Sequence, residues 1–347
     1  IQNEPSFIIS LDLNSHMKKR SFKPFGNISA LTLGGGGLGQ VWGETSREEA
    51  VATVNLALEN GISHFDVAPM YGNGEAEIVV AEALKGKEIN EIRITTKCSL
   101  GTLPDEKVYD YLNKSLTESL DNLKMERVDL FLLHSQLRED DFQLQILNSH
   151  RDALTTSLSC YFNAVIPAFE KLKSEGKITS WGVGGLGQNK AIIDAINHSV
   201  PPEAIQCVVN PLNSAGAIGY VDKAYDPNSI LKAAQESDIP ILGIRAVQAG
   251  ALTSQMDREP HKSGRDVKDF EDYIRAKPFR EFAKEYGSTP SHLAHRYALS
   301  IDKISSIILG VKNRRELQEC LDAEFMGPLT QDEIDHINTV LLVDRDL

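Results

Sequence analysis

Hydrophobic residues recur along the chain in eight short runs that are rich in β-branched and aromatic side chains. Each run holds five to seven residues between polar or glycine-containing segments, which is typical of strands buried on both faces. Strands are therefore predicted at residues 30–34, 63–68, 92–97, 128–134, 178–184, 205–210, 241–247 and 305–311.

Amphipathic stretches lie between these runs, with apolar residues three and four positions apart, as on one face of a helix. Gly61, Gly86 and Gly176 stand at the ends of three stretches, where glycine commonly ends a helix. Helices are therefore predicted at residues 47–61, 74–86, 105–123, 162–176, 189–199, 229–238, 278–300 and 314–325.

Strand and helix thus alternate eight times, without a proline- or serine-rich linker that would divide the chain. Such alternation requires parallel strands joined by right-handed crossovers, and eight strands are the number that closes a barrel. We predict the α/β fold class, as a single-domain (β/α)8 TIM barrel over residues 17–345, after an N-terminal extension at residues 1–16. An open, doubly wound sheet is the alternative, because local pattern does not distinguish it from a closed one.

Three segments are predicted as additions to the barrel. Residues 17–30 form a hairpin at its bottom, residues 135–160 form a polar insertion after the fourth strand, and residues 330–342 form an extra C-terminal helix. In such barrels, functional residues lie at the carboxyl ends of the strands.

Composition narrows the partners that the protein can take. The 347 residues include 36 Lys and Arg against 49 Asp and Glu, a formal net charge of −13. This charge argues against nucleic acid and anionic membrane as partners, because their phosphates would be repelled. No signal peptide is apparent, and no apolar run approaches the ~20 residues of a membrane span.

The cysteines point to a reducing compartment. Cys98, Cys160, Cys207 and Cys320 are far apart and form no C-x-x-C pair, so neither a zinc site nor a disulfide framework is expected. The cytoplasm fits this pattern best.

Two turns share the glycine spacing G-x-G-x-x-G, GGGGLG at residues 34–39 and GVGGLG at residues 182–187. In a Rossmann domain such a turn cradles a dinucleotide, and an acidic residue about 20 positions on, at a strand end, binds the ribose. Here the acidic residue, Glu203, lies in the lead-in to the sixth strand instead. Both turns are therefore interpreted as barrel loops.

Four polar side chains stand at or just beyond the ends of the second, third and fourth strands: Asp66, Tyr71, Lys97 and His134. Each alone has a structural explanation, such as a capping aspartate or a buried histidine, but four on one rim indicate a site. An ammonium beside a phenol, whose ordinary pKa is about 10, would lower that pKa. Asp66 would balance the charge of Lys97, and His134 would donate to a carbonyl oxygen.

These residues lie in segments that resemble the signatures of the aldo-keto reductases, NAD(P)H-dependent carbonyl reductases built on the (β/α)8 barrel. The segments are GISHFDVAPMYGNGEAE, ITTK and DLFLLH. The resemblance implies that Tyr71 is the general acid in reduction and the general base in oxidation. It further implies that Lys97 and Asp66 tune Tyr71, and that His134 positions the carbonyl of a small aldehyde, ketone or aldose.

The resemblance also implies nicotinamide contacts at the later strands. Gln206 matches the family glutamine that bonds the carboxamide, whereas Gly184 and Gly185 replace a common Ser-Asn pair. Ile244 and Arg245 stand where an aromatic residue often stacks, so Arg245 is expected to face the cofactor pyrophosphate. These departures resemble the branch with aldose 1-dehydrogenases and pyridoxal dehydrogenases, whose first turn is similar to GGGGLGQVWG.

The adenine end of the cofactor maps to the segment LGVKNRRELQEC, where the start of the last barrel helix favours anions. Glu316 and Cys320 replace an arginine and an asparagine that are common in the family. NADP(H) is slightly favoured over NAD(H). Cofactor contacts are predicted here for Gly310, Lys312, Arg314, Arg315 and Glu319.

Other candidate residues are interpreted as structural. His292 and His295 share a helix face without a third ligand, so no metal site is predicted. Cys98 beside Lys97 lacks a nearby base and is assigned to packing. Trp42 in the first loop either lines a substrate mouth or covers the barrel.

The predicted function is therefore a reversible carbonyl reductase or alcohol dehydrogenase, in which aldose dehydrogenase activity is one option. The alternative is a regulatory protein of the same fold that binds cofactor with little turnover, as the family's ion-channel β-subunits do. The presence of all four tetrad residues favours the enzyme over the regulatory protein. The substrate, the direction of reaction and the oligomeric state are left open.

Overall fold

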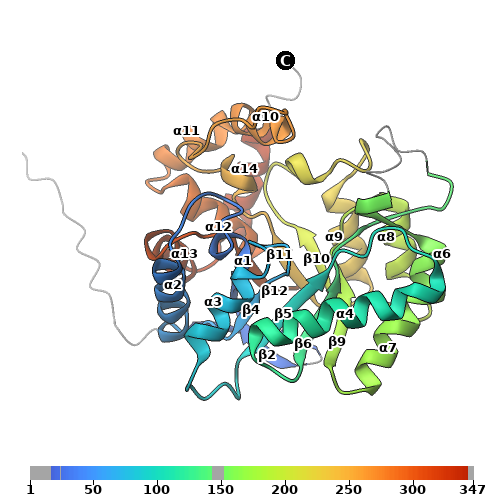
Figure 1. The fold of residues 1–347 in the computed structure, drawn as a ribbon. Coiled ribbons are helices and arrows are strands. Elements are labelled where there is room, and N and C mark those ends of the chain that lie inside the picture. The colour runs from blue at the N-terminus through green and yellow to red at the C-terminus, as the bar shows by residue number, and fades with distance from the viewer. Residues whose placement is uncertain (1–16, 24, 143–151, 343–347) are drawn as a thin grey trace, which may run out of the picture.

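The protein forms a closed barrel of eight parallel strands, so the predicted (β/α)8 barrel is confirmed and the doubly wound sheet is wrong (Figure 1). The computed structural model describes residues 17–23, 25–142 and 152–342, and the predicted extension at residues 1–16 lies outside them. All eight predicted strands are present, and they follow one another around the barrel in chain order. They are β3 (Leu31–Gly34), β4 (His64–Asp66), β5 (Arg93–Cys98), β6 (Val128–Leu133), β9 (Ile178–Val183), β10 (Ile205–Val208), β11 (Ile241–Ile244) and β12 (Ile304–Leu309).

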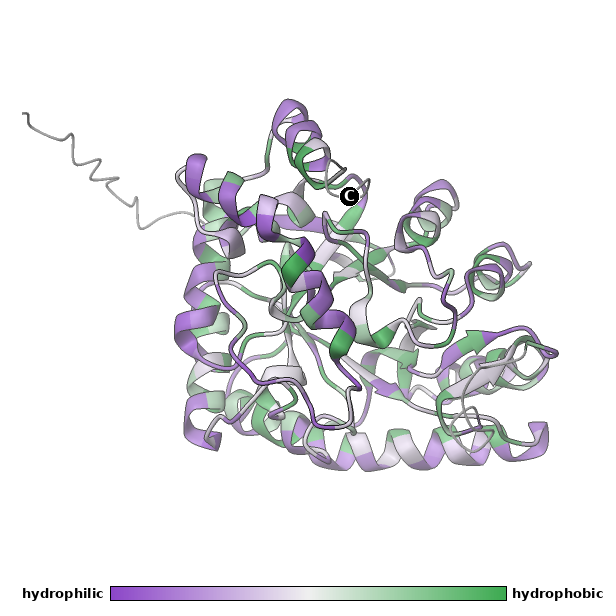
Figure 2. Cartoon of the chain, turned by 90° about the horizontal axis from the view of Figure 1, so that it is seen from above, coloured by the Kyte–Doolittle hydropathy of each residue, from purple (hydrophilic) through white to green (hydrophobic). Residues whose placement is uncertain are grey.

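Helices surround the barrel at each predicted stretch. Figure 2 shows hydrophobic and hydrophilic residues along the surrounding helices, the amphipathic pattern on which the prediction rests. They are α2 (Arg47–Glu59), α3 (Glu75–Leu84), α4 (Asp105–Leu123), α7 (Ile166–Ser174), α8 (Asn189–Ile196), α9 (Pro227–Glu236), α12 (Pro290–Ser300) and α13 (Arg314–Met326).

One predicted helix, at residues 278–300, is divided in the structure. It forms α11 (Lys277–Glu285) and α12, because the hydroxyl of Thr289 caps the second helix and Pro290 occupies its first position. A further amphipathic helix, α10 (Val267–Arg275), is absent from the prediction. Its apolar residues follow a polar loop that masks the start of the helical pattern.

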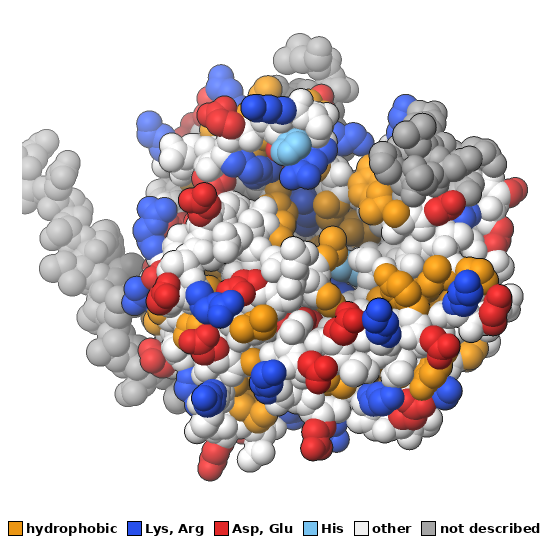
Figure 3. All heavy atoms as spheres, in the orientation of Figure 1, with side chains coloured by type: hydrophobic (Ala, Val, Ile, Leu, Met, Phe, Trp, Pro, Cys, Tyr) orange, Lys and Arg blue, Asp and Glu red, His pale blue; other side chains and the backbone are white. Residues whose placement is uncertain are grey.

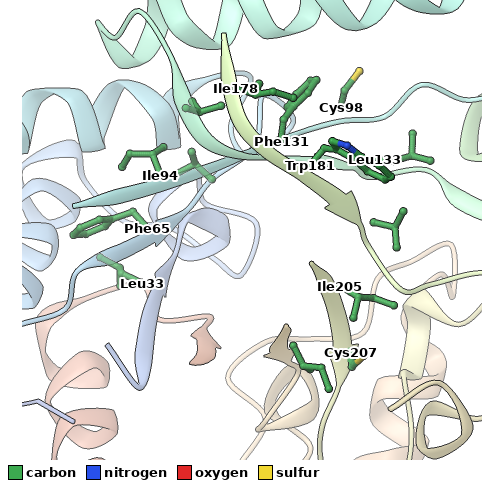
Figure 4. Packing of buried hydrophobic residues seen from close by; sticks show 14 of the residues in the cluster. Leu33, Phe65, Ile94, Cys98, Phe131, Leu133, Ile178, Trp181, Ile205 and Cys207 are labelled. Carbon is green, nitrogen blue, oxygen red and sulfur yellow. The ribbon is translucent and has the colours of Figure 1, made fainter. Parts of the chain in front are cut away.

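The main core lies between the strands and these helices. Side chains that point outward from the strands, among them Leu33, Phe65, Phe131 and Trp181, are fully buried there. Figure 4 shows these residues with Ile205 on their strands. Alternation along each strand therefore leaves the other set of side chains, which includes Asp66, Lys97 and Gln206, pointing into the barrel.

A hairpin closes the bottom of the barrel, as predicted for residues 17–30. Its strands, β1 (Lys19–Phe22) and β2 (Gly26–Ser29), pair antiparallel. Phe22 and Ile28 from this hairpin pack against Leu130, Leu132 and Leu242 in the barrel interior. Burial of each such side chain stabilises the fold by about 1.5–3 kcal/mol, so the bottom is sealed and the opposite end is left for a site.

The remaining additions lie beside the rim and at the C-terminus. The predicted insertion contains β7 (Gln136–Arg138), β8 (Thr155–Ser157) and α6 (Leu158–Cys160), and its residues 143–151 lie outside the described ones. The predicted final helix is α14 (Gln331–Leu342), which packs on α11. Within the described ranges, none of the helices has the length and apolar character that crossing a bilayer requires.

Candidate active site

Asp66, Tyr71, Lys97 and His134 meet at the carboxyl end of the barrel. Parallel pairing aligns Asp66 with Thr95 of β5, and it aligns Lys97 with Leu132 of β6. Because the two strands are adjacent, the carboxylate and the ammonium meet inside the barrel. The structure thus brings together the four residues that the sequence predicts as a site.

The ammonium of Lys97 is the centre of this group. Its Nζ donates to Oδ1 of Asp66 at 2.5 Å, to the backbone oxygen of Val67 at 2.9 Å and to the hydroxyl of Tyr71 at 3.2 Å. Lys97 is fully buried and Asp66 nearly so. The three donated bonds use the full capacity of an ammonium and fix its position relative to the phenol.

Burial and charge act in opposition on the lysine and the tyrosine. Burial alone would lower the pKa of Lys97, but Asp66 and Tyr71 raise it above its ordinary value, so the ammonium keeps its proton. Burial raises the pKa of Tyr71, and the nearby charge of Lys97 opposes this rise without cancelling it. The predicted lowering by Lys97 is therefore present, but the larger effect of burial leaves the pKa of Tyr71 above its ordinary value.

His134 follows β6 and faces the same phenol. Its ring lies edge-on to the ring of Tyr71, with centroids 5.9 Å apart. Burial, and then the charge of Lys97, lower the pKa of His134 to about 3. The imidazole is therefore neutral near pH 7 and offers one N–H donor, as positioning a carbonyl oxygen requires.

The loop that carries Tyr71 is held between two backbone segments. Its N–H donates to Ala68, and its carbonyl accepts from Ala76 in the first turn of α3. A Cβ at Gly39, in the first-strand turn, would lie 2.5 Å from the carbonyl carbon of Tyr71. Glycine at position 39 therefore lets the GGGGLG turn support the tyrosine loop, a role distinct from phosphate binding.

Gln206, on β10, reaches the same centre from the opposite wall. Its Nε2 donates to Oδ2 of Asp66 at 2.8 Å, and both side chains are buried. Sequence reasoning did not anticipate this bond, because it joins residues 140 positions apart.

Glu77 is a second buried residue that sequence reasoning missed. Its carboxylate accepts from Thr96 Oγ1 at 2.7 Å and from Asn122 Nδ2 at 2.9 Å, and it is fully buried. Thr96 precedes Lys97 on β5, so Glu77 connects α3 and α4 to the lysine strand. The available signal in the sequence is the position of Glu77 in the first turn of α3, a helix that begins directly after the left-handed Gly74. Acidic residues are favoured in the first turn of a helix.

A cavity of about 260 Å³ opens beside Lys97 and His134. Its wall continues over Met70 and Ser99 to Tyr111 on α4, so it mixes polar and apolar groups. On the face drawn in Figure 3, hydrophobic side chains and Lys and Arg side chains gather around a hollow beneath α10. A small polar molecule can thus reach the tetrad.

Arg245, which the sequence predicts to face the cofactor pyrophosphate, is paired with a carboxylate of the protein. Its guanidinium is buried and pairs with Asp269 of α10 at 2.5 Å, while its Nε donates to Gln248. Arg245, Gln248 and Ala249 all have positive φ, between 47° and 61°, so this turn is strained and the buried ion pair holds it. The expected pyrophosphate contact of Arg245 stays a prediction, and within the protein this guanidinium already forms a buried ion pair.

The segment after β12 places the predicted adenine-end residues at the start of α13. Lys312 pairs with Asp257 and, at 3.4 Å, with Glu316, whose carboxylate also accepts from the Lys312 backbone. Arg314 pairs with Glu49 at 2.9 Å. Two of the three predicted cations are therefore balanced by carboxylates of the protein.

The other positions in this segment differ in exposure. Arg315 and Gly310 are exposed, and Glu319 is half-buried. Cys320 is buried against His295, with Sγ 3.5 Å from Nε2, so it faces α12 and not the surface. Arg315 is the one predicted cation for which the described residues supply no ion pair.

The residues interpreted as structural lie as follows. Burial raises the pKa of Cys98 to about 11, which leaves it a thiol. The indole Nε1 of Trp42 lies 2.8 Å from where a Cβ of Gly36 would stand and 3.3 Å from that of Gly310, so it covers the turns after β3 and β12. Over the described part of the chain, no group of three or more His, Cys, Asp or Glu is placed to hold a metal ion.

Comparison with known proteins identifies relatives over nearly the whole chain. Residues 30–341 match the sequence model of the aldo/keto reductase family. The chain is 25% identical to L-galactose dehydrogenase of Arabidopsis thaliana over 335 residues, which cover 94% of this chain and 95% of that protein. It is 26% identical to D-threo-aldose 1-dehydrogenase of a Pseudomonas species over 262 residues, 69% of this chain and 70% of that one.

The fold has a counterpart among solved structures. An aldo-keto reductase from Bacillus halodurans, in its holo form, superposes with a TM-score of 0.70 at 22% identity. The superposition covers 94% of this chain and 96% of that one.

Proposed function

Because the chain belongs to the aldo/keto reductase family, we propose that it is an NAD(P)H-dependent oxidoreductase that interconverts a carbonyl compound and its alcohol. The observation that carries the proposal is the contact of the Tyr71 hydroxyl with the Lys97 ammonium at 3.2 Å, within a buried group that includes Asp66. Proposed substrates are aldehydes, ketones and aldoses, the last supported by the names of two dehydrogenase relatives.

In the proposed reaction Tyr71 transfers the proton and His134 holds the oxygen. Because burial raises the pKa of Tyr71, the phenol carries its proton near pH 7 and is ready to act as an acid in reduction. The neutral His134 donates to the carbonyl oxygen, where negative charge develops. Lys97 stabilises the phenolate that remains after proton transfer.

The residues at the rim fit a nicotinamide dinucleotide, the cofactor that the family uses. The amide of Gln206 lies beside the tetrad, and Gly184 and Gly185 at the adjacent turn have no side chains that would obstruct a planar group. At the other end, the start of α13 offers the backbone N–H and the exposed side chain of Arg315, whereas the N–H groups of Arg314 and Glu316 already donate to Glu49 and Asn313. When bound, the cofactor would supply or accept the hydride.

We propose NADP(H) as the slightly preferred cofactor. Lys312 and Arg314 lie where a 2′-phosphate would benefit from positive charge, but each is paired with a carboxylate. The advantage over NAD(H) is therefore expected to be less than about tenfold in affinity. Fluorescence titration with both dinucleotides measures it.

The decisive test is turnover with a panel of aldehydes, ketones and aldoses, followed through the absorbance of NADPH or NADH. We expect turnover by the wild type and a loss of at least about 10²-fold in kcat for Tyr71→Phe. Tyr109→Phe is the matched control, because it removes the same hydroxyl group from a tyrosine on the outside of the barrel, where that hydroxyl donates to Glu175. Full activity of Tyr71→Phe would contradict the assignment of the acid.

Binding of a dinucleotide without turnover on the whole panel would favour the regulatory alternative.

We also propose a single domain over residues 17–345 and a reducing compartment, such as the cytoplasm. All four cysteines are buried and free, which supports the second of these proposals.

A further inference from the structure

A hydrogen bond crosses the interior of the barrel just below its rim. It joins Nε2 of Gln206 on β10 to Oδ2 of Asp66 on β4, over 2.8 Å. In the closed order of eight strands, β4 and β10 are four positions apart, so they stand on opposite walls. Both residues are buried, at 5% and 2% exposure. The bond therefore connects the catalytic group to the wall on which Gln206 lies.

The chemistry of Asp66 fixes which end of the Gln206 amide takes part. An ionised carboxylate only accepts hydrogen bonds, so Gln206 must turn its NH2 group toward Asp66. The other oxygen of Asp66 is occupied by Lys97 at 2.5 Å. Gln206 consequently turns its Oε1 away from Asp66, and no described residue donates to that oxygen.

The turn at Gly184 and Gly185 has no polar side chain that would compete with Oε1 of Gln206 for a ligand. A Cβ at Gly185 would lie 1.9 Å from the backbone oxygen of Gln206, so the two segments pack backbone to backbone. Gly184, the other residue of the pair, likewise supplies no polar side chain. A ligand at this wall therefore meets one oriented acceptor, which suits an NH2 donor such as a primary carboxamide.

We propose that Asp66 is a positioning residue for cofactor recognition in addition to its place in the tetrad. By holding the NH2 group of Gln206, Asp66 directs Oε1 of Gln206 to accept from the carboxamide NH2 of the nicotinamide. This inference rests on the proposed function, because it requires that a nicotinamide dinucleotide binds. One carboxylate then aligns both the lysine that serves Tyr71 and the amide that selects the cofactor.

The test compares two ligands that differ in one donor. NADP⁺ has a carboxamide NH2, whereas its 3-acetylpyridine analogue has a methyl group in that place and keeps the carbonyl. Dissociation constants are measured from quenching of tryptophan fluorescence, without any substrate or turnover. For the wild type we expect NADP⁺ to bind about five- to tenfold more tightly than the analogue, the value of one neutral hydrogen bond.

Two variants separate the roles of the amide and of the carboxylate. Gln206→Met removes the acceptor, so the ratio of the two dissociation constants should fall to about one. In Asp66→Asn, the new asparagine still accepts from Lys97 through its side-chain oxygen, so its NH2 group faces Gln206. The amide of Gln206 must then rotate so that its Oε1 accepts from this NH2 group. The ratio should again fall to about one, while affinity for the acetyl analogue is retained.

Gln188→Met is the matched control. Gln188 is also a buried glutamine whose Nε2 donates to a carboxylate, that of Glu139, but its Oε1 already accepts from the Glu139 backbone. This variant should keep the wild-type ratio. Circular dichroism at the titration temperature establishes that each variant is folded, and Gln206→Leu replaces Gln206→Met if the latter is not.

The outcomes are distinct. A wild-type ratio near one, or an unchanged ratio in Gln206→Met, would show that Oε1 of Gln206 does not bind the carboxamide. An unchanged ratio in Asp66→Asn alone would show that Asp66 does not orient the amide. Each of these overturns the inference and leaves the proposed function intact, whereas absence of binding by both dinucleotides to the wild type overturns both.

Discussion

At the scale of single residues, the charge state of Tyr71 decides how the rate depends on pH. Reduction requires the phenol as an acid, and burial raises the pKa of Tyr71 above its ordinary value of 10. Reduction should therefore be constant from about pH 6 to pH 9. Oxidation requires the phenolate as a base, so its rate should rise with pH throughout that range. His134 adds no change near pH 6.5, because its pKa is lowered to about 3.

Lys97→Met tests whether the lysine acts on Tyr71 through charge. Without the cation that opposes burial, the pKa of Tyr71 rises further, so the rising limb for oxidation should move to higher pH and kcat should fall. Lys114→Met is the control, since Lys114 borders the same cavity but is 78% exposed. If the rate of oxidation rises over the same pH range in Lys97→Met as in the wild type, the lysine acts only through packing.

The identities of the tetrad residues follow from sequence, but their energetics do not. Strand ends and the signature segments locate Tyr71 and Lys97 correctly on one rim. The net rise in the pKa of Tyr71 depends on how completely the surrounding loops exclude water, which no local pattern encodes. Arg245 illustrates the same limit, because its partner Asp269 lies on α10, a helix that the pattern did not predict.

At the scale of elements, Glu77 should matter more than any surface carboxylate in α3. Replacement by alanine leaves Asn122 without its acceptor and leaves Thr96 only the contact with Ser119 at 3.5 Å. Glu77→Ala should therefore lower the free energy of unfolding by about 2–4 kcal/mol. Urea denaturation measures the change. Glu75→Ala, which removes a carboxylate from an ion pair with Arg47 at the surface of the same turn, should cause little change.

Equal effects of Glu77→Ala and Glu75→Ala would contradict this role of Glu77. A second measurement distinguishes position from stability, because Glu77 also sets where β5 lies relative to the tyrosine loop. Glu77→Ala should lower kcat more than it changes KM at a temperature where the variant remains folded.

Strands and most helices could be predicted because their signals are local. Parallel strands covered on both faces read as continuous apolar runs, and all eight were found at their places in the barrel. The division between α11 and α12 depends on Thr289 and Pro290, which a periodicity of 3.6 residues passes over. Contacts such as Asp66 with Gln206 join strands on opposite walls, so they follow only once the barrel is closed.

At the scale of the whole molecule, three histidines with lowered pKa values should make the fold sensitive to mild acid. The pKa is lowered to about 3 at His64 and His134 and to about 4 at His295, in each case chiefly by burial. In the unfolded chain each would take up a proton near pH 6.5, whereas in the folded chain it does not. The unfolded state thus binds more protons, and stability is lost as pH falls below 6.5.

The expected loss between pH 6.5 and pH 5.5 is about 1 kcal/mol for each histidine, or about 3 kcal/mol for the three together. Carboxylates with ordinary pKa values near 4 contribute little in this interval. The free energy of unfolding by urea at the two pH values measures the loss, and His295→Gln should reduce it by about one third. An equal free energy of unfolding at both pH values would show that the barrel admits protons to these rings, and that the site around His134 is wetter than its burial indicates.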